Sequence, residues 1–106
     1  MSSSRYKPKD QCACIGFKGE MLEKIAKVCS DIAKKDSTFK YRILNSKFPQ
    51  YDFLLVVFTG PGKEGANLAH KRATWLVKKA FPEFSLCYWV KYAKDVKDQA
   101  VEPGQL

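Results

Sequence analysis

Residues 38–59, TFKYRILNSKFPQYDFLLVVFT, hold two strand patterns of different kinds in succession. In residues 38–44 aromatic and aliphatic side chains alternate with basic ones, which is typical of a strand buried on one face. Residues 45–50 contain a proline and predict a loop. In residues 52–59 nearly every position is apolar, which predicts a central strand covered on both faces.

A helix is predicted on each side of this pair of strands. Residues 20–35 repeat apolar side chains at spacings of three and four, and acids stand four positions before lysines on the exposed side. After the break at Gly60-Pro61-Gly62, residues 63–80 carry alanines along one face, which predicts a close approach of helix to sheet. Pro82 ends this second helix because it cannot continue the hydrogen-bond ladder.

Two further strands complete the pattern. Residues 11–17 are short and apolar, as in a buried strand, and residues 84–92 alternate again. The order β-α-β-β-α-β predicts an α+β domain in which two helices pack on one face of a four-stranded antiparallel sheet, with the first and third strands central. This order resembles the ferredoxin-like arrangement, which hosts many unrelated functions and so implies none by itself.

The 106 residues predict one domain, and 45% hydrophobic residues suffice for a core. We assign residues 11–92 to this domain, residues 1–10 to a flexible basic arm and residues 93–106 to a tail. The longest apolar run, residues 53–58, is too short to cross a bilayer, and no signal peptide is evident. We therefore expect no membrane partner and a cytoplasmic protein, or a nuclear one if the host is a eukaryote.

The charge balance points to a polyanionic partner. Lysine and arginine outnumber aspartate and glutamate by 19 to 11, a formal charge of +8. Such an excess favours RNA, single-stranded DNA or an acidic protein as partner, although it also serves solubility alone.

The predicted sheet offers one candidate surface. If the helices cover one face, the opposite face carries four basic and aromatic residues, Lys40, Arg42, Trp89 and Lys91, as in surfaces that bind single strands. The third strand lacks the basic-glycine-aromatic signature of RNA-recognition domains and presents aliphatic residues instead. The alternative is therefore a protein–protein interaction module, a homodimer or an adaptor or inhibitor, that docks through the same face.

Further basic residues are candidate phosphate contacts. Lys63 lies beside the glycine-rich turn at a helix start, and Lys71 and Arg72 follow two turns later. The turn matches neither a Walker loop nor a dinucleotide fingerprint. Arg5 and Lys7 belong to the basic arm.

Nothing in the sequence predicts catalysis, a metal or a cofactor. His70 is the one histidine and lies beside Lys71 and Arg72 on the second helix. The four cysteines are expected to be reduced thiols that act mainly as small buried hydrophobes: Cys12, Cys14, Cys29 and Cys87. We therefore expect no enzyme, and a nucleic-acid-binding module ahead of a protein-binding one.

Overall fold

The computed structural model describes residues 10–84, 86–92 and 100–101. The predictions for the basic arm, including Arg5 and Lys7, and for most of the tail lie outside these residues. No helix in the described ranges has the length and apolar character needed to cross a membrane. The elements follow one another as β1 (Asp10–Phe17), η1 (Gly19–Met21), α1 (Leu22–Lys35), β2 (Lys40–Ser46), β3 (Phe53–Pro61), α2 (Gly62–Trp75), η2 (Leu76–Ala80), η3 (Pro82–Phe84), β4 (Tyr88–Tyr92) and β5 (Ala100–Val101).

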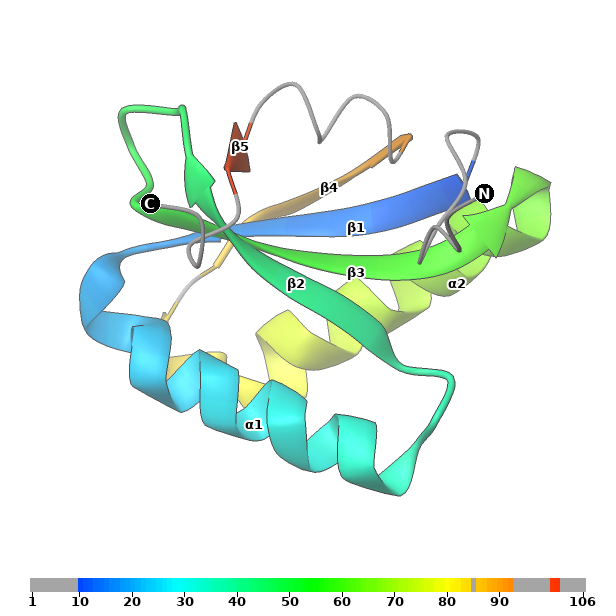
Figure 1. The fold of residues 1–106 in the computed structure, drawn as a ribbon, viewed down its shortest axis with the longest axis horizontal. Helices are drawn as coiled ribbons and strands as arrows, with labels where there is room; N and C mark the ends of the chain where they lie inside the picture. The colour runs from blue at the N-terminus through cyan, green and yellow to red at the C-terminus, as the bar shows by residue number, and fades with distance from the viewer. Residues whose placement is uncertain (1–9, 85, 93–99, 102–106) are drawn as a thin grey trace.

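The ferredoxin-like α+β prediction is confirmed. The sheet has the order β4-β1-β3-β2-β5, every pairing in it is antiparallel, and both helices lie on one side of it (Figure 1). β1 and β3 are central, as their apolar sequences require. The structure adds the two-residue strand β5, which pairs with β2 at Asn45 and Ser46 and lies in the segment assigned to the tail.

The last predicted strand begins four residues later than its alternating pattern indicates. Pro82 opens the 3-10 turn η3, in which the Phe84 N–H donates to the Phe81 carbonyl at 3.1 Å. The Phe84 ring lies 6.4 Å from the fully buried Phe81 ring, so local packing holds this residue out of the sheet. Strand pairing starts only at Tyr88, opposite Ile15.

The sheet is buried on both faces. On the helix side, Ile15, Leu55 and Val57 share a core with residues of α1 and α2. On the other side, Cys14, Val56 and their neighbours form a second buried cluster. β3 contributes to both, which confirms that it is covered on two faces.

The junction between β3 and α2 brings helix and sheet unusually close. The register of β1 against β3 shifts between Gln11 and Cys12, which leaves Thr59 as an extra, bulged residue. The Thr59 hydroxyl donates to the carbonyl of Gly65 in the first turn of α2, at 2.6 Å. A Cβ on Gly65 would lie 1.9 Å from the carbonyl oxygen of Gly60, so only glycine fits there. The predicted close approach is therefore confirmed at this turn.

Candidate nucleic-acid interface

The four residues predicted for the open sheet face do lie on the side away from the helices. The strand register aligns them in two rows across the sheet, which read Lys91, Cys12, Phe58, Lys40 and Trp89, Cys14, Val56, Arg42. Each basic or aromatic residue thus stands at an edge of the four-stranded core, with two apolar strands between the pairs.

The centre of this face is not open, which corrects the expectation of an exposed binding surface. Cys12, Cys14 and Val56 have exposed fractions of 0% within the single chain. Phe48, from the loop between β2 and β3, packs on this cluster together with Trp89. The aliphatic centre is therefore buried without a second subunit, and bases have no access to it.

Trp89 is engaged by the chain's own aromatic residues. Its ring meets Phe48 edge-on, with centroids 5.7 Å apart, and lies 6.2 Å from the ring of Tyr51. Tyr51 in turn lies flat over Gly16, where a Cβ would come within 2.5 Å of the ring. The side chain predicted to stack on bases thus holds the β2–β3 loop against the sheet.

The predicted phosphate contacts on α2 lie in the helix layer, on the other side of the sheet from Trp89. Lys63 and Lys71 are exposed on α2, whose other side buries Ala69 and Ala73 against the sheet. The sequence-predicted residues therefore form two surfaces, separated by the sheet.

In the glycine-rich turn, Gly60 at φ 111° and Gly62 at φ 71° both adopt a backbone conformation that favours glycine.

The exposed side of α2 and η2 gathers basic residues around a tryptophan. Trp75 is 50% exposed, and it is the one large hydrophobic residue exposed among those the structure describes. It follows Lys71 by four positions, one helical turn, and precedes Lys78 and Lys79 in the π-helical turn η2. We call this set the α2 surface: Lys63, His70, Lys71, Trp75, Lys78 and Lys79.

The lysines of the α2 surface are not neutralised by neighbouring acids. On α1, by contrast, Lys27 pairs with Asp31, and Lys24 pairs with Glu83. Within the described ranges, no ion pair involves a lysine of the α2 surface. Sequence reasoning identified Lys63 and Lys71 but overlooked Trp75. Its position on the polar side of the helix could have predicted that it is exposed.

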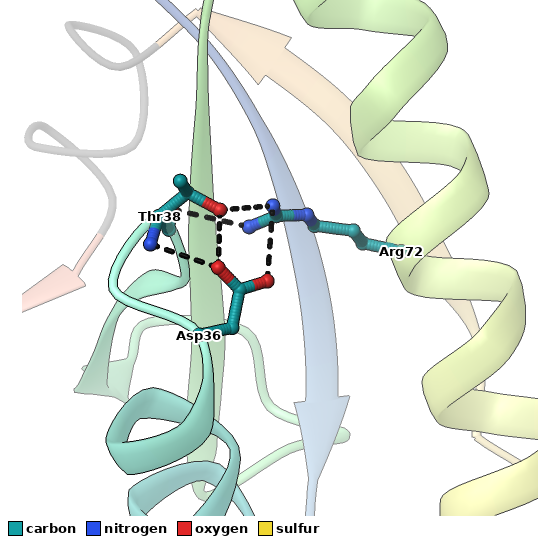
Figure 2. Close-up of polar contacts among 3 residues, drawn as sticks. All are labelled: Asp36, Thr38 and Arg72. Atoms are coloured by element: carbon teal, nitrogen blue, oxygen red, sulfur yellow. Dashed lines mark hydrogen bonds and ion pairs between the residues drawn. The ribbon is translucent and has the colours of Figure 1, made fainter.

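Arg72 serves the protein's own structure. Its guanidinium donates to the Thr38 carbonyl at 3.3 Å and to the Thr38 hydroxyl at 2.9 Å, and it lies 3.8 Å from a carboxylate oxygen of Asp36 (Figure 2). It also lies over the Phe39 ring, 5.6 Å from the centroid. This residue therefore ties α2 to the loop after α1 and is not a free phosphate contact.

Asp36 ends α1 and organises the loop that follows. The carboxylate accepts from the Thr38 N–H at 2.9 Å and from the Thr38 hydroxyl at 2.6 Å (Figure 2). These two hydrogen bonds, with the charge of Arg72 adding to them, lower the pKa of Asp36 below its usual 3.8. The carboxylate is thus ionised throughout the physiological pH range.

We expect NMR titration of the Asp36 carboxyl to give a pKa below 3.8, and Thr38→Val to raise it towards that value by removing the hydroxyl donor. A depressed folded-state pKa means that the stabilising contribution is present above pH 3.8 and is lost as the pH falls through the lower, folded-state pKa. Ser37→Ala, in the same loop, is the control and should leave the titration unchanged. An Asp36 that titrates at 3.8 in the wild type would contradict this hydrogen-bond network.

A groove runs beside the α2 surface, between the end of α1 and α2. Its volume is about 330 Å³. Three charged residues line the groove, Asp36, Lys71 and Arg72. The rest of its wall is apolar: Ile32, Phe39, Leu68, Trp75 and Leu76. Lys71 and Trp75 belong to both the groove and the α2 surface, so the two features are continuous.

The cysteines do not gather into a metal-binding cluster in the described part of the chain. There, no three histidine, cysteine, aspartate or glutamate residues come close enough to hold a metal. A hydrogen bond with Cys12, together with burial, raises the pKa of the Cys14 thiol, and burial raises the pKa of Cys29 to about 12. Because the thiolate is the reactive and metal-binding form, these buried thiols are suited to packing. Cys87, by contrast, is exposed, which corrects the expectation that it is a buried hydrophobe.

Comparisons with known proteins add little to this geometry. No protein-family model matches the chain, and no curated protein sequence does. A crystal structure described as a PII-like signaling protein from Thermus thermophilus aligns with 85% of this chain and 94% of its own, at 9% identity and a TM-score of 0.43. We draw nothing about function from a similarity this low.

Proposed function

We propose that this protein is a non-enzymatic module that binds single-stranded nucleic acid, RNA or DNA, through the α2 surface. The observation that carries the proposal is Trp75, a half-exposed indole with lysines one turn before it and shortly after it. Lysines neutralise phosphates, while an exposed aromatic ring stacks on an unpaired base of any identity.

Three features support a single strand as the ligand. The formal charge of +8 attracts a polyanion, and the cations of the α2 surface have no acidic partners in the described ranges. A base reaches a tryptophan ring only when it is unpaired and unstacked, which excludes the interior of a duplex. The sheet face is less suitable because its centre is buried.

The burial of the sheet face also weakens the main argument for the alternative, a protein–protein interaction module that docks through this face. A docking subunit was expected because an aliphatic sheet face left bare would be unusual in a monomer. The chain buries Cys14 and Val56 by itself, so this face requires no partner. Two grooves on the described residues still have room for one: the groove beside Trp75, and a groove of about 290 Å³ at the β2 edge of the sheet, lined by Phe39, Lys40, Tyr41, Arg42 and Phe58.

The two tryptophans provide the test. Trp75→Ala is expected to weaken binding of a uridine octamer by about 5- to 150-fold, the effect of losing one base–aromatic stack of roughly 1–3 kcal/mol. In Trp89→Phe, which keeps an aromatic ring against Phe48, affinity should be unchanged and the octamer should quench the remaining fluorescence of Trp75.

Fluorescence and anisotropy titrations at fixed salt measure both effects. Trp75→Phe retains Trp89 as the single reporter and should show little quenching. Quenching of Trp89 with full affinity in Trp75→Ala would place the strand on the sheet side and contradict the α2 surface as the site.

A further inference from the structure

The groove beside Trp75 has the size and character of a small-molecule subsite. Its volume of about 330 Å³ falls at the lower end of the roughly 300–1,000 Å³ of ligand pockets. Such pockets combine an apolar wall with a few polar groups that fix orientation. Here Phe39, Leu68 and Leu76 form part of the apolar wall, and the charged groups stand together with them.

The charged groups of the groove suit the edge of a planar ring. Asp36 is ionised and can only accept hydrogen bonds, and one of its oxygens, Oδ1, receives both bonds from Thr38. The other oxygen, Oδ2, lies 3.8 Å from the nearest Arg72 nitrogen, beyond hydrogen-bond distance, and retains its acceptor capacity. Arg72 holds this carboxylate in position, while Lys71 adds donors.

Among the four bases, guanine matches this arrangement best. Its Watson–Crick edge carries two adjacent N–H donors, at N1 and N2, beside the O6 acceptor. The free oxygen of Asp36, Oδ2, can accept from both adjacent donors, whereas the Lys71 ammonium donates to O6. Adenine, cytosine and uracil each carry an acceptor atom next to their donor on this edge, so none of them offers two adjacent donors to Oδ2.

The surroundings of the groove complement a phosphate backbone. Lys71 lies at its wall, and Lys34 and Lys35, both exposed, immediately precede Asp36 in the last turn of α1. A strand that follows the α2 surface therefore passes the groove with cations on both helices. Trp75 borders the groove and offers its ring to a base that enters it.

We propose that the groove receives one unstacked base of the strand bound along the α2 surface, and that guanine is the base it prefers. This inference rests on the proposed function and gives the module a specificity that stacking alone does not supply. Asp36 and Lys71 contact the base, Trp75 covers its ring, and Arg72 is a positioning residue.

The test compares uridine octamers that carry guanine, adenine, cytosine or an abasic sugar at one central position. In the wild type, the guanine octamer should bind about tenfold more tightly than the abasic octamer, in line with the discrimination of a specific base contact. Asp36→Asn, which replaces an acceptor with a donor, and Leu68→Trp, which fills the groove without a change of charge, should each bring this ratio to about one.

The ratio of guanine-octamer to abasic-octamer affinity separates the proposal of a base subsite from the proposal of strand binding on the α2 surface. Because both octamers are measured on the same protein, a partly unfolded variant lowers both affinities and leaves the ratio interpretable. Equal, tight binding of guanine and abasic octamers by the wild type would overturn the base subsite and leave the α2 surface standing. No binding of either octamer at low salt would overturn both.

Discussion

Replacing Lys63, Lys78 and Lys79 together with alanine is expected to weaken binding of a uridine octamer about 100-fold at about 0.1 M salt. Each lysine that neutralises a phosphate releases counterions, and on single strands each contact adds roughly 0.7 to the slope of log affinity against log salt. Losing three contacts should therefore lower that slope by about 2. The three lysines are exposed, so the fold should survive.

A charge-matched control separates the α2 surface from net charge. Lys18, Lys27 and Lys40 are also exposed but lie before η1, on α1 and on β2. Their triple alanine variant removes the same charge and should retain most of the slope, because distant surface charges are largely screened. Anisotropy titrations from low to high salt measure both slopes. Equal losses in the two variants would mean that binding follows net charge and involves no defined surface.

The order and type of the elements were predictable because local patterns and tertiary burial agree. The alternation of residues 38–44 and the apolar run of residues 52–59 each correspond to a strand in the place the pattern predicts. Phe84 was predicted to open the last strand and does not, because its alternation is overridden by Pro82 and by packing on Phe81. A pattern of period two says which residues share a face, but not where pairing begins.

The candidate site was less predictable because it depends on contacts between distant parts of the chain. The sequence places Lys40, Arg42, Trp89 and Lys91 on one face, and the register confirms it. It does not reveal that Phe48 packs on this face and that Tyr51 and Phe48 contact the ring of Trp89. Nor does it reveal that Arg72, 34 residues from Thr38, uses its donors within the protein.

The exposed indole of Trp75 was accessible to sequence reasoning in principle. A helix whose alanines face the sheet must point the residue two positions after Ala73 away from it, since two positions correspond to roughly 200° of rotation at 3.6 residues per turn. Exposed lysines flank it, so the combination of charge and ring follows from helical geometry alone. The sequence does not reveal the groove, because the groove forms only when the fold brings Ile32 and Phe39 beside α2.

The largest effect on stability is expected at Gly65, where two principles oppose each other. Helix propensity favours Gly65→Ala by about 1 kcal/mol. The new Cβ, however, would lie 1.9 Å from the Gly60 carbonyl oxygen and 2.5 Å from its carbon, and these are backbone atoms that cannot rotate away. The start of α2 would have to move off β3, which also breaks the 2.6 Å hydrogen bond from the Thr59 hydroxyl.

We therefore expect Gly65→Ala to lower the free energy of unfolding by about 3 kcal/mol, the upper part of the range for overpacked sites. Asn67→Ala, exposed two positions later in the same helix, is the matched control and should be neutral or slightly stabilising. Urea unfolding followed by circular dichroism measures both. A stabilised Gly65→Ala variant would mean that propensity outweighs the contact and that α2 does not meet β3 this closely. Because that contact fixes where the helix begins, it also fixes which residues of α2 face outward, and with them the position of Lys71 and Trp75.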